Sequence, residues 1–217
     1  MSALQGFALY RFYHVGDGET AALRGVDVQV DAGELVALVG PSGSGKSTLL
    51  SCLAGLDEPD GGSVEVMGQR LSRRPEATRA SLRARHIGMM MQSGNLFDHL
   101  TVASNIALQI KVSHKGDPGS LLERLGISEH ADALPSQLSG GEAARAGLAV
   151  ALAADPDILI CDEPTGEVDA DTERHVLEFL AERRRAGCAV LVATHSALLA
   201  HQADRVLQIR DGRIVDA

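Results

Sequence analysis

The fold of this chain is decided by Gly40-Pro41-Ser42-Gly43-Ser44-Gly45-Lys46-Ser47-Thr48, which follows an apolar run at residues 35–39 and precedes a helix-forming run at residues 48–54. The pattern G-x-x-x-x-G-K-S between a strand and a helix predicts a phosphate-binding loop. Its glycines let successive backbone N–H groups turn toward one anion, and the following helix adds the positive end of its dipole. We expect Lys46 to reach the β- and γ-phosphates and the Ser47 hydroxyl to bind Mg²⁺.

Two other interpretations fit this stretch less well. A glycine-rich turn with an incidental lysine would not need the full eight-position pattern. A dinucleotide-binding turn needs a third glycine, which residues 43–48 lack. The sequence therefore predicts an ATP-binding loop formed by Gly40, Ser42, Gly43, Ser44, Gly45, Lys46, Ser47 and Thr48.

Length and composition limit the class of protein. A chain of 217 residues that is 45% hydrophobic can bury a substantial core, so we expect one domain with at most a small appended subdomain. The net charge of −9 argues against a nucleic-acid partner, because phosphate backbones are held mainly by basic patches. It does not argue against ATP, since charges beyond a Debye length of about 8–10 Å are screened and local groups dominate.

The cysteines and the apolar runs bear on the compartment. Cys52, Cys161 and Cys188 lie in apolar runs without metal-ligand spacing, which predicts reduced core thiols in a cytoplasmic protein. No basic-then-apolar leader opens the chain, and the longest apolar run, residues 146–154, is shorter than the roughly 18–20 residues that a membrane span needs. We therefore expect that the chain itself does not cross a bilayer.

Apolar periodicity predicts two kinds of strand. Alternating residues predict an N-terminal antiparallel sheet, whereas fully apolar runs predict strands buried on both faces of a parallel sheet. An Asp211-Gly212 turn predicts a C-terminal hairpin. The expected antiparallel strands are 7–13, 26–30 and 63–68, with a turn at 16–18; the expected buried strands are 35–39, 87–92, 157–161 and 189–193; the hairpin strands are 205–209 and 213–215.

Helical patterns divide the chain into two parts. Short helices separated by Gly, Pro and polar residues predict a helical subdomain over residues 93–154. Residues 1–92 and 155–217 are then expected to form the α/β core together with the antiparallel sheet, all within a single domain over 1–217. The expected helices are 48–54, 75–85, 101–110, 119–125, 128–134, 142–154 and 170–186.

An apolar strand at residues 157–161 delivers two acids, Asp162 and Glu163, at its C-terminal end. In an open α/β sheet this end is where ligands bind. We expect Asp162 to hold Mg²⁺, through a water, and Glu163 to polarise the water that attacks the γ-phosphate. The alternative, an ordinary acidic start to a loop, is weakened by the phosphate loop elsewhere in the chain.

A second glycine-rich helix start, Leu138-Ser139-Gly140-Gly141-Glu142, is another anion site by its geometry. One chain thus has two anion sites and one obvious ligand. We predict a two-fold homodimer in the ATP-bound state, in which Ser139, Gly140, Gly141 and Glu142 of each copy close over the γ-phosphate held by Lys46 of the other. A helix capped by Ser139, with glycines for the turn, is the alternative.

Phosphate loop, Leu-Ser-Gly-Gly signature and Cys-Asp-Glu-Pro-Thr run occur in this order, and along nearly its whole length the chain resembles the nucleotide-binding subunits of ABC transporters. Tyr13 with residues 16–20, and the run at 162–166, most resemble the branch of lipoprotein-release, macrolide-export and cell-division ATPases (LolD, MacB and FtsE types). The resemblance implies an α/β fold: a P-loop NTPase core with a mostly parallel sheet, an N-terminal antiparallel β subdomain and a helical subdomain that carries the signature.

The resemblance also implies roles for four more residues. Tyr13 matches the aromatic residue that stacks on adenine, although a core aromatic is the alternative. Gln92 matches the glutamine that touches Mg²⁺ and the attacking water and links to the membrane subunit. Asp169 matches the aspartate that communicates between paired sites, and His195 matches the histidine that contacts the γ-phosphate.

These observations lead to one functional prediction. The chain is expected to be the Mg²⁺-dependent ATPase subunit of an ABC transporter, on the inner face of the cell membrane, driving a separate transmembrane permease in export or in lipoprotein- or macrolide-type mechanotransmission. The expected catalytic residues are Glu163, His195 and Gln92, and the expected metal ligands are Ser47, Gln92 and Asp162.

Three other functions fit the sequence to different degrees. A regulatory ATPase that signals through a membrane partner without transport remains open, because it needs the same chain. A DNA-repair or translation ATPase of the same superfamily is disfavoured by the chain length and by the acidic net charge. A small nucleotide kinase is disfavoured because it would not need residues 138–142.

Overall fold

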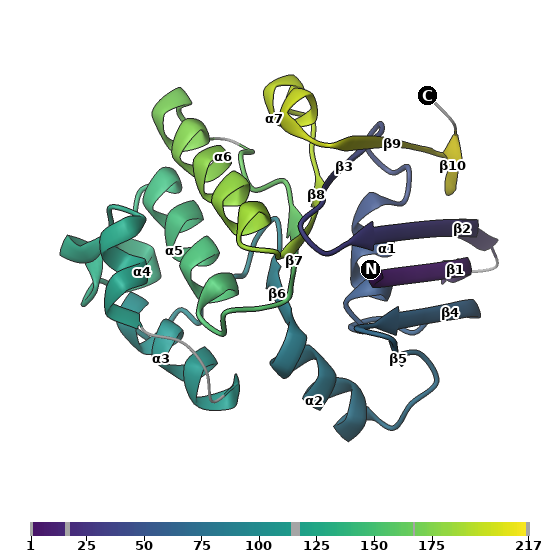
Figure 1. The fold of residues 1–217 in the computed structure, drawn as a ribbon, viewed down its shortest axis with the longest axis horizontal. Helices are drawn as coiled ribbons and strands as arrows, with labels where there is room; N and C mark the ends of the chain where they lie inside the picture. Colours follow the sequence, from purple (N-terminus) through teal and green to yellow (C-terminus); the bar gives the residue numbers. More distant parts are fainter. Residues whose placement is uncertain (1, 16–17, 114–117, 167, 216–217) are drawn as a thin grey trace.

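The computed structural model describes residues 2–15, 18–113, 118–166 and 168–215, and its strands form two sheets (Figure 1). The first sheet is antiparallel and has the order β2 (Gly18–Asp31), β1 (Ser2–Val15), β4 (Gly61–Val66), β5 (Gln69–Arg70). The second has the order β10 (Arg213–Val215), β9 (Arg205–Arg210), β3 (Leu35–Val39), β8 (Ala189–Ala193), β7 (Ile158–Asp162), β6 (Ile87–Met90).

The six-stranded sheet is parallel from β9 to β6, and only β10 runs antiparallel to its neighbour. Its central strands β3, β7 and β8 are buried apolar runs, as expected for strands covered on both faces. Leu38 of β3 and Asp162 of β7 both pair with Ala193 of β8. The loops that follow these three strands therefore leave the sheet at the same edge.

Seven α-helices are described, and they surround the six-stranded sheet. The helix α1 packs between the two sheets, whereas α3, α4 and α5 gather on the side away from the antiparallel sheet (Figure 1). The helices are α1 (Lys46–Leu53), α2 (Glu76–His86), α3 (Val102–Ser113), α4 (Pro118–Arg124), α5 (Gly140–Leu152), α6 (Ala170–Arg185) and α7 (Ala197–Gln202).

Two hydrophobic cores lie on the opposite faces of the six-stranded sheet. One contains Leu49 and Leu53 of α1 between the sheets. The other contains Leu148 of α5 and Leu180 of α6. Because α1 begins at Lys46, the core that holds Leu49 and Leu53 also fixes the start of the helix that follows the phosphate loop.

Several predicted elements are confirmed. Strands β3 and β8 occupy the predicted residues 35–39 and 189–193, and the hairpin of β9 and β10 forms around Asp211-Gly212. Strands β1 and β2 are longer than predicted, because register shifts around Ala8, whose φ is +46°, absorb residues that break the alternation. Of the predicted turn at 16–18, residues 16 and 17 lie outside the described part.

Other predicted elements are wrong in type or extent. The helix predicted at 128–134 is replaced by 3₁₀ turns at Ser128–His130 and Pro135–Gln137. The carbonyls of Ala131 and Ala133 accept hydrogen bonds from the first N–H groups of α3, so they are not available to a continuous helix. Strand β6 ends at Met90 rather than at residue 92, and the helix α7 was not predicted.

The predicted division of the chain at residues 93–154 stays a prediction. Helices α3, α4 and α5 all lie within that segment.

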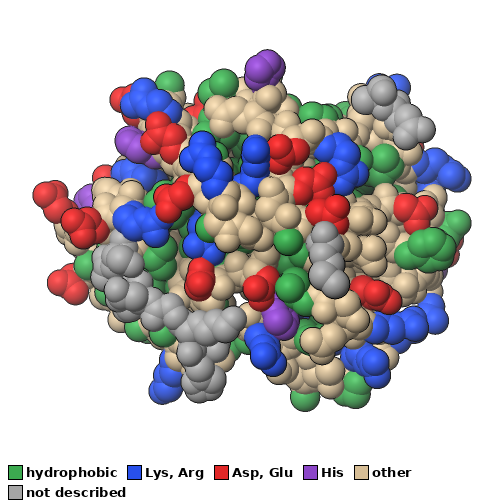
Figure 2. All heavy atoms as spheres, viewed as in Figure 1, with side chains coloured by type: hydrophobic (Ala, Val, Ile, Leu, Met, Phe, Trp, Pro, Cys, Tyr) green, Lys and Arg blue, Asp and Glu red, His purple; other side chains and the backbone are tan. Residues whose placement is uncertain are grey.

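Within residues 2–15, 18–113, 118–166 and 168–215, no helix is long and apolar enough to span a membrane. The three cysteines are free and buried, as predicted. Figure 2 shows acidic and basic side chains interspersed over one face of the molecule.

Helix α5 approaches β6 closely at Gly88. A Cβ added there would lie 2.1 Å from the Ala151 carbonyl oxygen and 2.8 Å from Pro156 Cγ. We expect Gly88→Ala to lower the free energy of unfolding by about 1–3 kcal/mol, because the helix must shift outward. Urea unfolding monitored by circular dichroism measures this loss. Met89→Leu, a volume-conserving change at the next residue, is the control, and equal stability of both variants would contradict the close approach.

Candidate functional site

A cavity of about 560 Å³ opens where β3, β7 and β8 end. Segments far apart in the sequence meet in it, and a volume of this order suits a bound small molecule. The residues that line it are Tyr13, Thr20, Ala21, Ala22, Arg24, Ser42, Gly43, Gly45, Lys46, Ser47, Thr48, Gln92, Asp162, Glu163, Gly166, His195, Asp211 and Gly212.

The glycine loop packs closely against β9 and β2. A Cβ at Gly40 would lie 2.2 Å from the Ile209 carbonyl oxygen, and one at Gly45, whose φ is +107°, would lie 2.5 Å from the Ala22 carbonyl oxygen. These two glycines are therefore required by packing as well as by the turn. Gly45 caps α1 without a side-chain hydrogen bond, which leaves the first-turn N–H groups of the helix to an anion.

Two buried polar groups of the loop lie at this helix start. Ser44 is 4% exposed, and within the described residues its hydroxyl has no hydrogen-bond partner. Lys46 is 7% exposed, and its Nζ donates to the carbonyl oxygens of Gly40 at 2.8 Å and Pro41 at 3.2 Å. Nζ also lies 3.4 Å from His195 Nε2. The ammonium group is thus held at the cavity by carbonyl oxygens rather than by a carboxylate.

The two acids at the C-terminal end of β7 differ in their surroundings. Asp162 is the last residue of the strand and is buried. Glu163 has a φ of +51°, a left-handed conformation that typically costs a non-glycine residue about 1–3 kcal/mol. Its Oε2 accepts a hydrogen bond from the His195 backbone N–H at 3.1 Å. Its Oε1 is buried, lies 3.3 Å from His195 Nε2, and forms no hydrogen bond with any described residue. That oxygen can accept a hydrogen bond from a water.

The oxygen donors of the cavity suit Mg²⁺. Ser47, Gln92 and Asp162 line the same cavity. The part of the chain that the structure describes contains no cluster of three His, Cys, Asp or Glu side chains that could hold a metal by themselves. Mg²⁺ is usually held by one or two protein oxygens together with substrate phosphates and waters, so this small donor set fits it.

The glycine-rich signature lies apart from this cavity. Ser139 is the exposed N-cap of α5: its hydroxyl accepts from the Glu142 N–H, and the Glu142 carboxylate accepts from the Ser139 N–H at 2.8 Å. The hydrogen bond from the Ser139 N–H, aided by that residue's hydroxyl, lowers the pKa of Glu142. Gly140 lines an adjoining cavity of about 310 Å³, which shares Gln92 and Glu163 with the first.

Asp169 lies beside the signature rather than at the phosphate loop. It caps α6, where it accepts hydrogen bonds from the Thr172 N–H at 2.8 Å and the Thr172 hydroxyl at 2.9 Å. The bond from the Thr172 N–H is the main cause of its lowered pKa. Arg145 of α5 donates to the Thr172 hydroxyl at 2.8 Å, so the N-terminal parts of α5 and α6 are tied together.

The cavity also contains residues that were not predicted from the sequence. They come from β2, from the loop after Glu163 and from the turn between β9 and β10, and no local pattern marks them. The Asp-Gly pair predicted a turn rather than a site, and the stretches that contain Thr20 and Gly166 pointed to a family branch rather than to this cavity. The residues are Thr20, Ala21, Ala22, Arg24, Gly166, Asp211 and Gly212.

A glycine loop between strand and helix, with a lysine and two acids at the same sheet edge, defines a nucleoside-triphosphate-binding protein of the α/β class. Comparison with known proteins agrees with this class and narrows it. The sequence profile of ABC transporters matches residues 23–166. The lipoprotein-releasing system ATP-binding protein LolD of Hyphomonas neptunium is 40% identical over 220 residues, which cover 98% of this chain and 96% of LolD.

A second relative is longer than this chain. The macrolide export ATP-binding/permease protein MacB of Salmonella typhimurium is 39% identical over 211 residues, which cover 94% of this chain and 33% of MacB. Among solved structures, a dimeric bacterial ABC transporter cassette has a TM-score of 0.94 at 29% identity, with 98% of this chain and 97% of that one covered. Its dimeric post-hydrolysis state bound to ADP and Pi has a TM-score of 0.93 at 28% identity and the same coverage.

The chain therefore belongs to the ABC transporter family, and it is an ATP-binding cassette ATPase of the branch that contains LolD and MacB. The predicted fold class is also confirmed, with an antiparallel sheet, a mostly parallel sheet and helices.

Proposed function

We propose that two copies of this chain close on two ATP molecules, hydrolyse them, and drive a separate transmembrane permease by closing and reopening. The observation that carries this proposal is the separation of two anion-binding helix starts within one chain. Lys46 lies in the phosphate cavity, whereas the exposed Ser139 does not line it. A second copy related by a two-fold axis would bring its signature residues to the γ-phosphate held by Lys46.

The residues of one cavity are proposed to bind and to position the reactants. Lys46 and the loop N–H groups neutralise charge on the γ-phosphoryl group, and catalysis of this kind is mostly electrostatics and placement. Ser47, Gln92 and Asp162 hold Mg²⁺, which when bound supplies further charge neutralisation at the phosphate oxygens.

The attacking water is proposed to lie beside the acid that follows β7. Glu163 accepts its proton through Oε1, which forms no hydrogen bond with the described chain, and His195, whose Nε2 lies 3.3 Å from that oxygen, contacts the γ-phosphate. Asp169, beside the signature of its own chain, is proposed to communicate between the two sites, because Arg145 and Thr172 tie its helix to α5.

The membrane partner is proposed from the relatives. LolD belongs by its name to a lipoprotein-releasing system, and MacB joins an ATP-binding part and a permease in one protein. Since LolD is by its name the ATP-binding protein of such a system and 96% of its length matches this chain, we propose that a permease acts with the chain as a separate protein. The chain would then lie on the inner face of the cell membrane, in export or in lipoprotein- or macrolide-type mechanotransmission.

A groove between α2 and α3 is proposed to receive a cytoplasmic segment of that permease. It has a volume of about 350 Å³ and is lined mainly by apolar side chains, with Arg83 and Gln109 among them. Leu56 and Val112 line it and are 51% and 54% exposed. Apolar surface of this kind at a groove is typical of a protein contact. The permease is the occupant that the MacB relative supports, because there the two parts act within one protein.

Removing the proposed base should trap the closed dimer. We expect Glu163→Gln to slow phosphate release by about a hundredfold or more, because an amide cannot take the proton from water. With ATP and Mg²⁺ the variant should elute from a sizing column as a dimer. Glu178→Gln, an exposed change on α6 outside the cavity, is the control and should behave as wild type. A Glu163→Gln protein that stays monomeric with ATP and Mg²⁺ would count against a dimer that closes on two ATP molecules.

Blocking the signature should separate binding from hydrolysis. We expect Ser139→Arg to abolish ATPase activity while leaving the ATP affinity of the monomer nearly unchanged, since this residue does not line its own phosphate cavity. Equilibrium binding of a fluorescent ATP analogue and phosphate release measure the two effects. Ser136→Arg places the same charge on a nearby exposed residue and is the control. Normal hydrolysis by Ser139→Arg would refute its action in the other copy's site.

A single introduced thiol can test the groove. The native cysteines are poor reactants, because burial raises the pKa of Cys52 to about 12 and of Cys188 to about 11 and also raises that of Cys161. With a bifunctional cross-linker in native membranes, we expect Val112→Cys to join the chain to a protein with membrane spans. Phe7→Cys, exposed on β1, is the control. Equal cross-linking from both positions, or cross-links only to proteins without spans, would contradict the proposed surface.

A further inference from the structure

Tyr13 lines the nucleotide cavity, as does Thr48, which forms a side-chain hydrogen bond with it, whereas Asp57 and Arg11, which also hold it, do not line the cavity. The Tyr13 hydroxyl donates a hydrogen bond to Asp57 Oδ2 at 2.7 Å, and the guanidinium carbon of Arg11 lies 4.7 Å from the ring centroid. A cation at this distance over the ring is favourable. Because Tyr13 is 37% exposed, packing alone does not fix the orientation of its ring. The contacts with Asp57 and Arg11 do so.

Both oxygens of the Asp57 carboxylate accept hydrogen bonds. Its Oδ2 also accepts from Arg11 Nε at 2.8 Å, and its Oδ1 accepts from the Glu58 N–H at 2.9 Å. Asp60 holds the same guanidinium group from another side, through Nη1 at 3.1 Å. Arg11 is therefore clamped by two carboxylates, and the cation over the Tyr13 ring has a defined place.

The protonation states of Asp57 and Tyr13 favour a strong hydrogen bond between the two side chains. Burial acts to raise the pKa of Asp57, but hydrogen bonds from Arg11 and Tyr13 outweigh it and leave that pKa below its ordinary value. Burial, aided by the hydrogen bond to Asp57, raises the pKa of Tyr13. At neutral pH the carboxyl is therefore ionised and the phenol keeps its proton. The hydrogen bond between them is charge-assisted.

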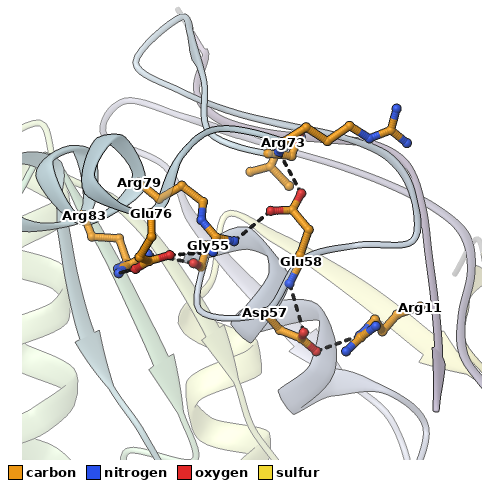
Figure 3. Close-up of polar contacts among 10 residues, drawn as sticks. Arg11, Gly55, Asp57, Glu58, Arg73, Glu76, Arg79 and Arg83 are labelled. Atoms are coloured by element: carbon orange, nitrogen blue, oxygen red, sulfur yellow. Dashed lines mark hydrogen bonds and ion pairs between the residues drawn. The ribbon is translucent and has the colours of Figure 1, made fainter. Parts of the chain in front are cut away.

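The loop that carries Asp57 is itself anchored to α2. Glu58 accepts a hydrogen bond from Arg79 Nη1 at 2.7 Å, and Arg83 Nη1 donates to the Gly55 carbonyl oxygen at 2.7 Å, as Figure 3 shows. The residues on both sides of Asp57 are thus tied to one helix. This makes the Asp57 carboxylate a fixed point against which an exposed ring can be oriented.

We propose that Asp57 is a positioning residue for the nucleobase: it holds the Tyr13 ring, backed by Arg11, in the orientation that stacks on the base. The inference rests on the proposed ATP site and deepens it. Asp57 acts only through Tyr13, and the ring touches the base rather than the phosphates. Loss of the contact therefore weakens nucleotide binding and leaves the phosphate chemistry unchanged.

The test compares a ligand that has a base with one that has none. Tyr13→Phe keeps the ring and removes the hydroxyl, whereas Asp57→Ala removes the acceptor. We expect each to raise the Kd and KM for ATP about three- to tenfold with kcat unchanged, as for the loss of one hydrogen bond. The Kd for inorganic tripolyphosphate should not change. Because both variants remove the hydrogen bond between Tyr13 and Asp57, the loss of ATP affinity in the double variant should be smaller than the sum of the two single losses.

Two further variants make the result specific. Asp57→Asn keeps an oxygen that can accept from the Tyr13 hydroxyl, so it should restore part of the ATP affinity lost in Asp57→Ala. Glu65→Gln removes an exposed carboxylate on β4 and should match wild type. If Asp57→Ala does not fold, Tyr13→Phe alone decides.

Two outcomes would overturn the proposal. One is unchanged ATP affinity in Tyr13→Phe. The other is an equal loss of ATP and tripolyphosphate affinity in Asp57→Ala, which would indicate a merely structural role. Absence of hydrolysis by the wild-type chain would instead refute the proposed function, since the binding comparison does not depend on turnover.

Discussion

The parallel pairing of β3, β8 and β7 is the constraint on which the site depends. Backbone hydrogen bonds continue this pairing beyond the strands, from the Thr194 N–H to the Leu38 carbonyl at 3.1 Å and from the Glu163 N–H to the Ala193 carbonyl at 2.9 Å. Three segments distant in the sequence therefore leave the sheet together. Without this shared edge of the sheet the phosphate loop could still bind an anion, but Asp162 and Glu163 would not lie beside it.

Charge inside the cavity is arranged locally. His195 Nε2 lies 3.4 Å from Lys46 Nζ and 3.3 Å from Glu163 Oε1, so one imidazole lies within reach of both a cation and an acid. Lys46 is held by carbonyl oxygens, and Glu163 keeps one oxygen without a hydrogen bond to the described chain. These groups explain how a chain with a net charge of −9 provides a site for a polyanion.

The N-terminal ends of α5 and α6 are joined to each other by hydrogen bonds. Ser139 caps α5 and Asp169 caps α6, and Arg145 joins them through Thr172. A Cβ at Gly141 would lie 2.9 Å from the Thr172 hydroxyl, so a glycine is needed for the two helices to approach. The signature and the segment after the acids are thus linked within the chain, although they were predicted from separate motifs.

The sequence alone predicted the elements whose cause is local. The phosphate loop depends on glycine torsions, a lysine and a helix start within nine consecutive residues, and the acids at 162 and 163 depend on a buried strand directly before them. The strands at 35–39 and 189–193 were predicted because each is itself a fully apolar run. Where a distant segment takes the backbone partners, as α3 does at 131 and 133, the prediction of a helix at 128–134 failed.

The remainder of the site was decided by the tertiary structure. Residues 20–22 and the turn at 211–212 reach the cavity only because the glycine loop is wedged between β2 and β9, with a Cβ at Gly45 only 2.5 Å from the Ala22 carbonyl oxygen. The position of Ser139 outside the cavity of its own chain is likewise a matter of packing. Sequence thus determined which chemical groups the chain carries and which torsions its loop adopts. Long-range pairing and close approach decided which of those groups meet, because these contacts join residues that no local pattern relates.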